Sequence, residues 1–93
     1  MQAMDQALTE IDIVTAPAFL AAMCEMIDRA DNPAVIIDCS AITFMGSDAF
    51  HAFIAAHDYA IARDHVLVIR GLAPHCLRVL RICDPGNELA IGP

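Results

Sequence analysis

The sequence predicts a single α/β domain, in which helices pack against a small, mainly parallel sheet. Short β-branched and apolar runs alternate with stretches in which apolar residues recur every three or four positions. No linker, repeat or low-complexity segment divides the 93 residues, a length that suits one hydrophobic core. We therefore expect one domain over residues 1–93, with the order βαβαβαβ and right-handed crossovers between parallel strands.

The first strand is expected in ALTEIDIV, residues 7–14, and should end near Val14. Thr15 can cap the helix that follows, and Pro17 falls in its first turn, where the missing N–H of proline costs nothing. Spacings of three and four predict one apolar face on this helix, which ADNP, residues 30–33, should end. That face consists of Leu20, Met23, Cys24 and Ile27.

The centre of the sheet is expected in AVIID, residues 34–38, because such a continuous apolar run is typical of a parallel strand buried on both faces. HVLVIR, residues 65–70, is predicted to be a second strand of this kind. ELAI, residues 88–91, is predicted to be a short last strand.

Two further helices complete the predicted order. One begins near Ser47, and its apolar stripe is expected to be Phe50, Phe53, Ile54, His57 and Ile61. Gly71 turns the chain, and Pro74 starts the last helix, which DPGN, residues 84–87, breaks. This last helix carries Cys76, Leu77, Leu80 and Cys83.

The charge balance excludes several classes of function. Twelve acidic residues against five basic ones give a net charge of −7, and every basic residue is an arginine. A chain without lysine has no Walker lysine, Schiff-base lysine or catalytic lysine. The acidic balance argues against nucleic acids and anionic membranes, which need clustered cations, and it fits a basic protein partner better.

Localisation is inferred from what the sequence lacks. No apolar run reaches the roughly 18 residues of a membrane span. The N-terminus lacks the basic and apolar regions of a secretory signal. A cytoplasmic protein is therefore expected.

The four cysteines form no CxxC pair and match no zinc-finger spacing, which favours buried thiols in a reducing compartment. Cys76 and Cys83 lie seven residues apart on one helical face, which leaves a redox role open for this pair. We expect no metal and no cofactor.

The stretch MGSD contains the residue with the most chemical interest, Ser47. As the N-cap of the second helix, its side chain would accept a hydrogen bond from a first-turn N–H, which is a purely structural role. A helix start also favours negative charge, so a phosphoserine would be accommodated there. The phosphate would add roughly −1.5 to −2 charge to an exposed tip and prevent a partner from docking.

A hydrolytic role for Ser47 is not expected, and neither is any other enzyme activity. MGSDA is not a GxSxG motif, because Ala49 takes the place of the second glycine. Asp48 and His51 project from the same short helix as the serine, a poor geometry for a catalytic triad.

Asp38 ends the central strand, where it either faces a partner or satisfies N–H groups of the following loop.

Two segments resemble the STAS domains, the sulphate-transporter and anti-sigma-factor-antagonist family. TEIDIVTAPAF, residues 9–19, is similar to the family's GELDxxTAPxL motif. VIIDCSAITFMGSDAFHAFI, residues 35–54, is similar to its VVLDLSxVxFxDSSGLxxLL core. The tail LRVLRICDPGNELAI, residues 77–91, resembles the closing helix and strand, so the likeness spans nearly the whole chain.

The resemblance implies a regulator of bacterial transcription, of the kind used in stress responses. An antagonist of this family binds an anti-sigma factor and so frees a sigma factor. The anti-sigma factor is itself a serine kinase that ends the binding by phosphorylating the antagonist, and a phosphatase restores it. Matched position by position, the phosphoacceptor is Ser47. The implied partner-binding residues are Asp38, Thr43, Phe44, Met45, Gly46, Asp48, Phe50 and His51.

Three positions depart from the family pattern, which has aspartate at Gly46, serine at Asp48 and glycine at Ala49. The first two changes favour an alternative, a STAS adaptor that binds a transporter subunit or signalling scaffold with Ser47 unmodified. In both cases we expect a monomer or weak homodimer that binds neither nucleic acid nor membrane. Only eight residues precede Thr9, so the N-terminal edge strand of the sheet can be missing.

Overall fold

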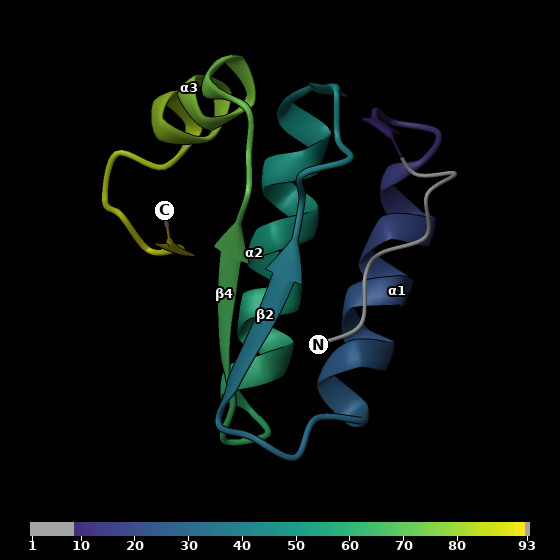
Figure 1. Cartoon of the computed structure of the whole chain (residues 1–93), viewed down its shortest axis with the longest axis vertical. Coiled ribbons are helices and arrows are strands. Elements are labelled where there is room, and N and C mark those ends of the chain that lie inside the picture. The colour runs from purple at the N-terminus through teal and green to yellow at the C-terminus, as the bar shows by residue number, and fades with distance from the viewer. Residues whose placement is uncertain (1–8, 93) are drawn as a thin grey trace.

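The computed structural model of the chain describes residues 9–92 and confirms the predicted α/β fold, with parallel strands and helices packed against them (Figure 1). The elements in order are β1 (Glu10–Ile11), α1 (Ala16–Asp28), β2 (Ala34–Asp38), β3 (Phe44–Met45), α2 (Ser47–Ile61), β4 (Val66–Arg70), α3 (Pro74–Cys83) and β5 (Ala90–Ile91). The short strand β3 was not expected, and it changes the order to βαββαβαβ. The predicted N-terminal edge position lies outside the described residues.

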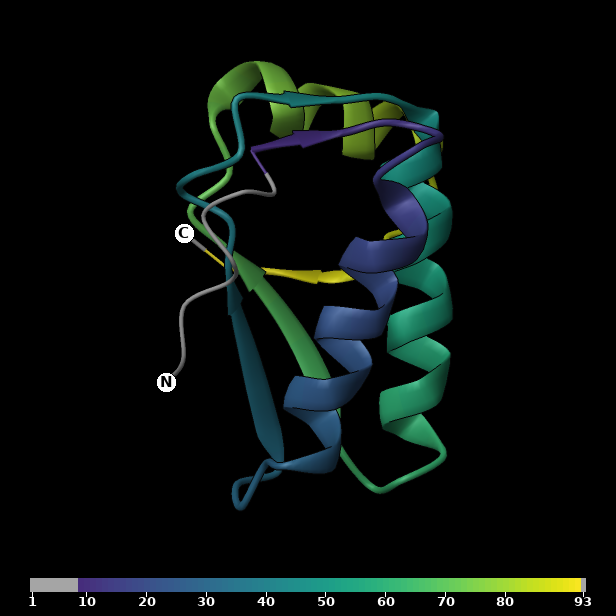
Figure 2. The same ribbon diagram turned by 90° about the vertical axis from the view of Figure 1, so that its right-hand side faces the viewer.

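The strands form two separate parallel sheets. One sheet has the order β2-β4-β5, in which Ala34 pairs with Val66 and Asp38 with Arg70. The other sheet consists of β1 and β3. In Figure 2, β1 and β3 run across the end of the molecule toward the starts of α1 and α2, whereas β2 and β4 run along its length.

The strands β2 and β4 are buried on one face. Val35 and Ile37 of β2, and Leu67 and Ile69 of β4, are each 5% exposed or less and belong to the core. The residues between them, such as Ile36, are half-buried or exposed. The expectation of burial on both faces is therefore wrong, because α1 and α2 lie on the same side of these strands (Figures 1 and 2).

The apolar faces expected on α1 and α2 are confirmed in part, since Met23, Ile27 and Phe53 are buried. Leu20, Phe50 and Ile54 pack against the core but are only half-buried. Helix α1 buries Phe19, Met23 and Ile27, whereas Leu20 and Cys24 are only half-buried.

The buried residues of α2 are Ala49, Ala52, Phe53, Ala56 and Ala60, while Ile61 is exposed. Alanine is only weakly apolar, so the buried alanines of α2 do not stand out in the periodic pattern of the sequence. Their small side chains let α2 lie close against its neighbours. The rings of Phe19 and Phe53 meet edge to face, 5.2 Å apart, where the two helices pack.

The first strand is shorter than expected, since β1 ends at Ile11 and the chain turns over residues 12–15 before α1 begins. The expectation of a strand that reaches Val14 is therefore wrong. Helix α3 starts at Pro74 as expected, and its buried residues are Cys76 and Leu80. Among residues 9–92, no helix is both long enough and apolar enough to span a membrane.

Removing the aromatic contact between α1 and α2 should cost far more than removing an exposed ring. We expect Phe53→Ala to lower the free energy of unfolding by about 3–5 kcal/mol, because it leaves a cavity beside Phe19. Phe44→Ala should cost about 1 kcal/mol or less, because that ring is 51% exposed. Urea unfolding followed by circular dichroism measures both, and equal losses would contradict this packing. Phe53→Leu is a milder variant in case Phe53→Ala does not fold.

Candidate functional site

The pairing of β1 with β3 brings two distant segments of the chain together at one end of the molecule. Thr43 N–H donates to the Thr9 carbonyl at 2.7 Å, and Gly46 N–H donates to the Ile11 carbonyl at 2.9 Å. Each strand then leads directly into the start of a helix: β1 by a turn into α1, and β3 into α2 (Figure 2). The turn after β1 and Ser47 are thereby held side by side.

Ser47 is the first residue of α2, and Gly46 is the N-cap, with the extended backbone angles φ −94° and ψ −174°. The expectation that Ser47 itself caps the helix is therefore wrong, and the helix has no side-chain cap bond. Ser47 is exposed, and its hydroxyl forms no hydrogen bond with any other residue in the described part of the chain. The position leaves the hydroxyl accessible at the positive end of the helix dipole.

The segment Asp12–Thr15, here called the Asp12 turn, is held by its own side chains. Asp12 Oδ1 accepts hydrogen bonds from the N–H groups of Val14 and Thr15, at 2.9 and 3.0 Å. Thr15 Oγ1 donates to the Glu10 carbonyl at 2.7 Å and accepts from Asp12 N–H at 2.9 Å. The N–H groups of Thr15 and Val14 lower the pKa of Asp12, because they stabilise its carboxylate.

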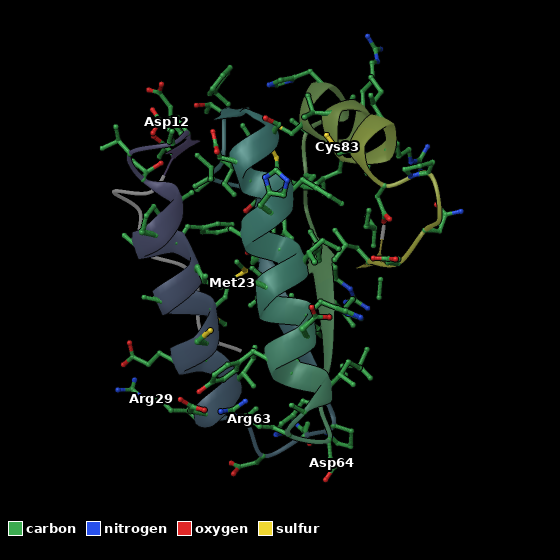
Figure 3. The ribbon with its side chains drawn as sticks, turned by 180° about the vertical axis from the view of Figure 1, so that it is seen from behind. Asp12, Met23, Arg29, Arg63, Asp64 and Cys83 are labelled. Atoms are coloured by element: carbon green, nitrogen blue, oxygen red, sulfur yellow. The ribbon has the colours of Figure 1, made fainter. Side chains whose placement is uncertain are left out.

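The Asp12 turn presents two large apolar side chains to solvent. Ile13 is 73% exposed and Val14 is 80% exposed, and Asp12 lies at the adjoining start of α1 (Figure 3). We expected Ile13 and Val14 to lie in a strand, because β-branched residues favour strands. The signal for a turn was present in Asp12, whose side chain readily bonds to N–H groups two and three residues on, just ahead of Pro17.

The other predicted contact residues near Ser47 differ in accessibility. Phe44 and His51 are exposed, and Phe50, whose ring lies 5.7 Å from that of His51, is half-buried. Met45 is only 2% exposed and belongs to the core, so its side chain cannot contact a partner in this conformation. Asp48 is half-buried in the first turn of α2.

Thr43 is exposed and fixed from two sides. Its hydroxyl donates to the Thr9 carbonyl at 3.2 Å. Its own carbonyl accepts a hydrogen bond from Nε2 of His75, on α3, at 2.7 Å. The segment before β3 is therefore tied to both β1 and α3.

Asp38 lies at the end of β2, in the other sheet, and holds the loop that follows. Its Oδ1 accepts from Ser40 N–H at 3.0 Å, and this bond lowers the pKa of Asp38. Gly71 closes against the same loop with φ 82°, and a Cβ there would lie 3.1 Å from Asp38 Oδ1. Of the two roles considered for Asp38, its geometry supports the structural one.

The cysteine pair considered for redox chemistry does not come together. Cys76 and Cys83 both lie on α3, where seven residues separate their Cα atoms by about 10 Å, too far for a disulfide. Burial raises the pKa of Cys76 and raises the pKa of Cys39 to about 12, so both thiols stay protonated at neutral pH. All four cysteines are free thiols.

A concave site that could hold a ligand lies away from Ser47. A cavity of about 430 Å³ lies where α1 ends and β2 begins, at the opposite end of α1 from the Asp12 turn (Figure 1). Its one arginine, Arg29, is paired with Glu25 at 2.6 Å. Within residues 9–92, no three His, Cys, Asp or Glu side chains are grouped so that they could hold a metal ion.

The structure is a small α/β domain in which Ser47 and the Asp12 turn lie near the starts of two helices and present exposed side chains. The chain belongs to the STAS domain family, because residues 6–89 match the family model described as "Mlab, STAS domain". No curated protein matches the sequence.

Because Gly46 caps α2 without a side chain, a residue with an acceptor group at this position should stabilise the protein. A Cβ at Gly46 would have no atom within 4 Å, and the extended backbone accepts any residue. We expect Gly46→Asp to raise the free energy of unfolding by about 0.5 kcal/mol, because its carboxylate accepts a first-turn N–H and faces the positive helix end. Gly46→Ala, which offers no acceptor, should show no such gain. Urea unfolding compares the two, and a lower stability for Gly46→Asp would contradict the cap geometry.

Proposed function

We propose that this protein is an anti-sigma factor antagonist in the bacterial cytoplasm. It binds a serine-kinase anti-sigma factor, frees a sigma factor and is switched off by phosphorylation of Ser47. The observation that carries the proposal is the exposed hydroxyl of Ser47 in the first turn of α2, which forms no hydrogen bond with another residue of 9–92. Membership of the STAS family supports it, since the family's phosphoacceptor serine falls at this position.

The surroundings of Ser47 suit a switch that leaves the fold intact. A phosphate on the first helical residue meets the positive end of α2 and free N–H groups, so the helix can accommodate it. The same phosphate adds roughly −1.5 to −2 charge beside Asp48. A partner that covers Phe44 and the helix start would have to desolvate that charge, so binding would end.

The proposal assigns the protein no catalytic step and no cofactor of its own. The kinase activity belongs to the anti-sigma factor, and a separate phosphatase returns Ser47 to its free form. The functional unit is a monomer or weak homodimer, and it binds neither nucleic acid nor membrane. Its net charge of −7 favours a partner whose contact surface is basic.

A second candidate is an adaptor that binds a transporter subunit or signalling scaffold with Ser47 unmodified. Gly46 and Asp48 favour this adaptor, because the family pattern has aspartate before the phosphoacceptor serine and a second serine after it. The fold does not force glycine at position 46, since the site has room for a side chain. The structure would accept aspartate at position 46, so the glycine there is compatible with the loss of a residue that a kinase recognises.

Intact-mass spectrometry separates the two candidates. The protein is incubated with ATP and with each purified serine-kinase anti-sigma factor of its host. We expect one added phosphate, mapped to Ser47 and absent in Ser47→Ala. Binding to one of these proteins without any added phosphate would support the adaptor instead, and no binding to any of them would overturn the antagonist role.

The charge of the phosphate should be sufficient to end binding. We expect Ser47→Glu to weaken binding to the anti-sigma factor at least tenfold, which corresponds to about 1.4 kcal/mol. Ser47→Ala should bind as the wild type does, yet the kinase should no longer be able to reverse its binding. Isothermal titration calorimetry measures both affinities. Binding of Ser47→Glu as tight as that of the wild type would show that negative charge at this position is not the switch.

A further inference from the structure

We infer that Ile13 and Val14 are the apolar anchor of the partner-binding surface, and that they insert into an apolar site on a partner protein rimmed by lysine or arginine. The inference rests on the proposed protein-binding role, but not on phosphorylation of Ser47. It applies to an anti-sigma factor and to an adaptor's partner alike.

Ile13 and Val14 differ from the other exposed apolar residues of the described chain in being neighbours. Ile13 and Val14 are adjacent, and both are more than 70% exposed. Across the β1–β3 pairing, the ring of Phe44 adds a third apolar group at the same end of the molecule. The remaining exposed large apolar residues of the described chain are single residues on other elements: Ile61 on α2, Val66 on β4 and Ile82 on α3.

The Asp12 turn holds its apolar side chains in a fixed position before any partner binds. Its backbone is fixed by hydrogen bonds from the N–H groups of Val14 and Thr15 to Asp12, and from the Thr15 hydroxyl to Glu10. Val14 is β-branched, so its side chain has few rotamers to lose. A preorganised apolar tip loses little conformational entropy on binding, which is the property of an efficient anchor.

Charge identifies the kind of surface that fits this anchor. Glu10 and Asp12 carry negative charge beside it in the chain, and Asp48 lies in the first turn of α2. Residues 9–28 and 38–62 contain no arginine and the chain contains no lysine, while α3, which His75 ties to Thr43, carries Arg78 and Arg81. Docking of this turn on the same turn of a second copy would bring like charges together. A partner with an apolar site rimmed by basic residues is complementary in both respects, and its binding should weaken as salt rises.

Site-specific photo-crosslinking in the native host tests the inference. Val14 is replaced by benzoylphenylalanine in one strain, and the equally exposed Ile82 in a control strain. We expect one protein adduct from position 14, absent from position 82, whose crosslinked peptide lies in an apolar site flanked by lysine or arginine. No adduct at position 14, the same adduct at both positions, or an acidic contact peptide would overturn the inference.

The protein trapped at position 14 is then purified and its affinity measured. We expect the double variant Ile13→Ser, Val14→Ser to bind it at least tenfold more weakly, while Ile82→Ser binds as the wild type does. Raising the salt concentration should weaken binding of the wild type. Unchanged affinity of the double variant would overturn the inference. Neither step requires ATP, so the anchor is tested independently of phosphorylation. If a partner binds through Val14 but never phosphorylates Ser47, the switch at Ser47 is refuted and the anchor stands.

Discussion

Backbone hydrogen bonds between distant segments determine where the accessible groups of this protein lie. Thr43 N–H and Gly46 N–H donate to the carbonyls of Thr9 and Ile11, and so join β1 to β3. The strands are only two residues long; β3 is followed by α2 after one residue, and β1 by α1 after the four residues of the Asp12 turn. The pairing therefore places the start of α2, with Ser47, beside the turn that opens α1.

This constraint explains how a domain with few reactive groups can act as a regulated binding module. The core is formed where α1 and α2 pack on one face of β2 and β4, and it reaches the helix starts through Ile11, Met45 and Ala49. Burial nevertheless leaves the end formed by β1 and β3 free to carry exposed apolar and acidic side chains. A modification at Ser47 changes the charge of that end without entering the core. Stability and recognition thus depend on largely different residues. In β3, for example, Met45 is buried in the core while the neighbouring Phe44 is exposed.

The sequence was sufficient to predict the helices, the strand β2 and the position of Ser47, because periodicity and β-branched runs report burial directly. It did not reveal β3, since two residues carry no periodic signal. Ile13 and Val14 were assigned to a strand from propensity, but the carboxylate of Asp12 bonds to the N–H groups that a strand would use. The capping role expected for Ser47 falls to Gly46, one residue earlier, because an extended glycine can precede the helix without a side-chain bond.

Amide hydrogen exchange measured by NMR tests the central claim, the β1–β3 pairing, most directly. The Gly46 amide proton is bonded to the Ile11 carbonyl, whereas Ser47 and Asp48, in the first turn of α2, have no intrahelical acceptor. The account predicts that Gly46 N–H exchanges at least about 100-fold more slowly than the N–H groups of Ser47 and Asp48. Exchange of Gly46 as fast as that of Ser47 would mean that β1 does not hold β3, and that Ser47 and the Asp12 turn do not form one surface.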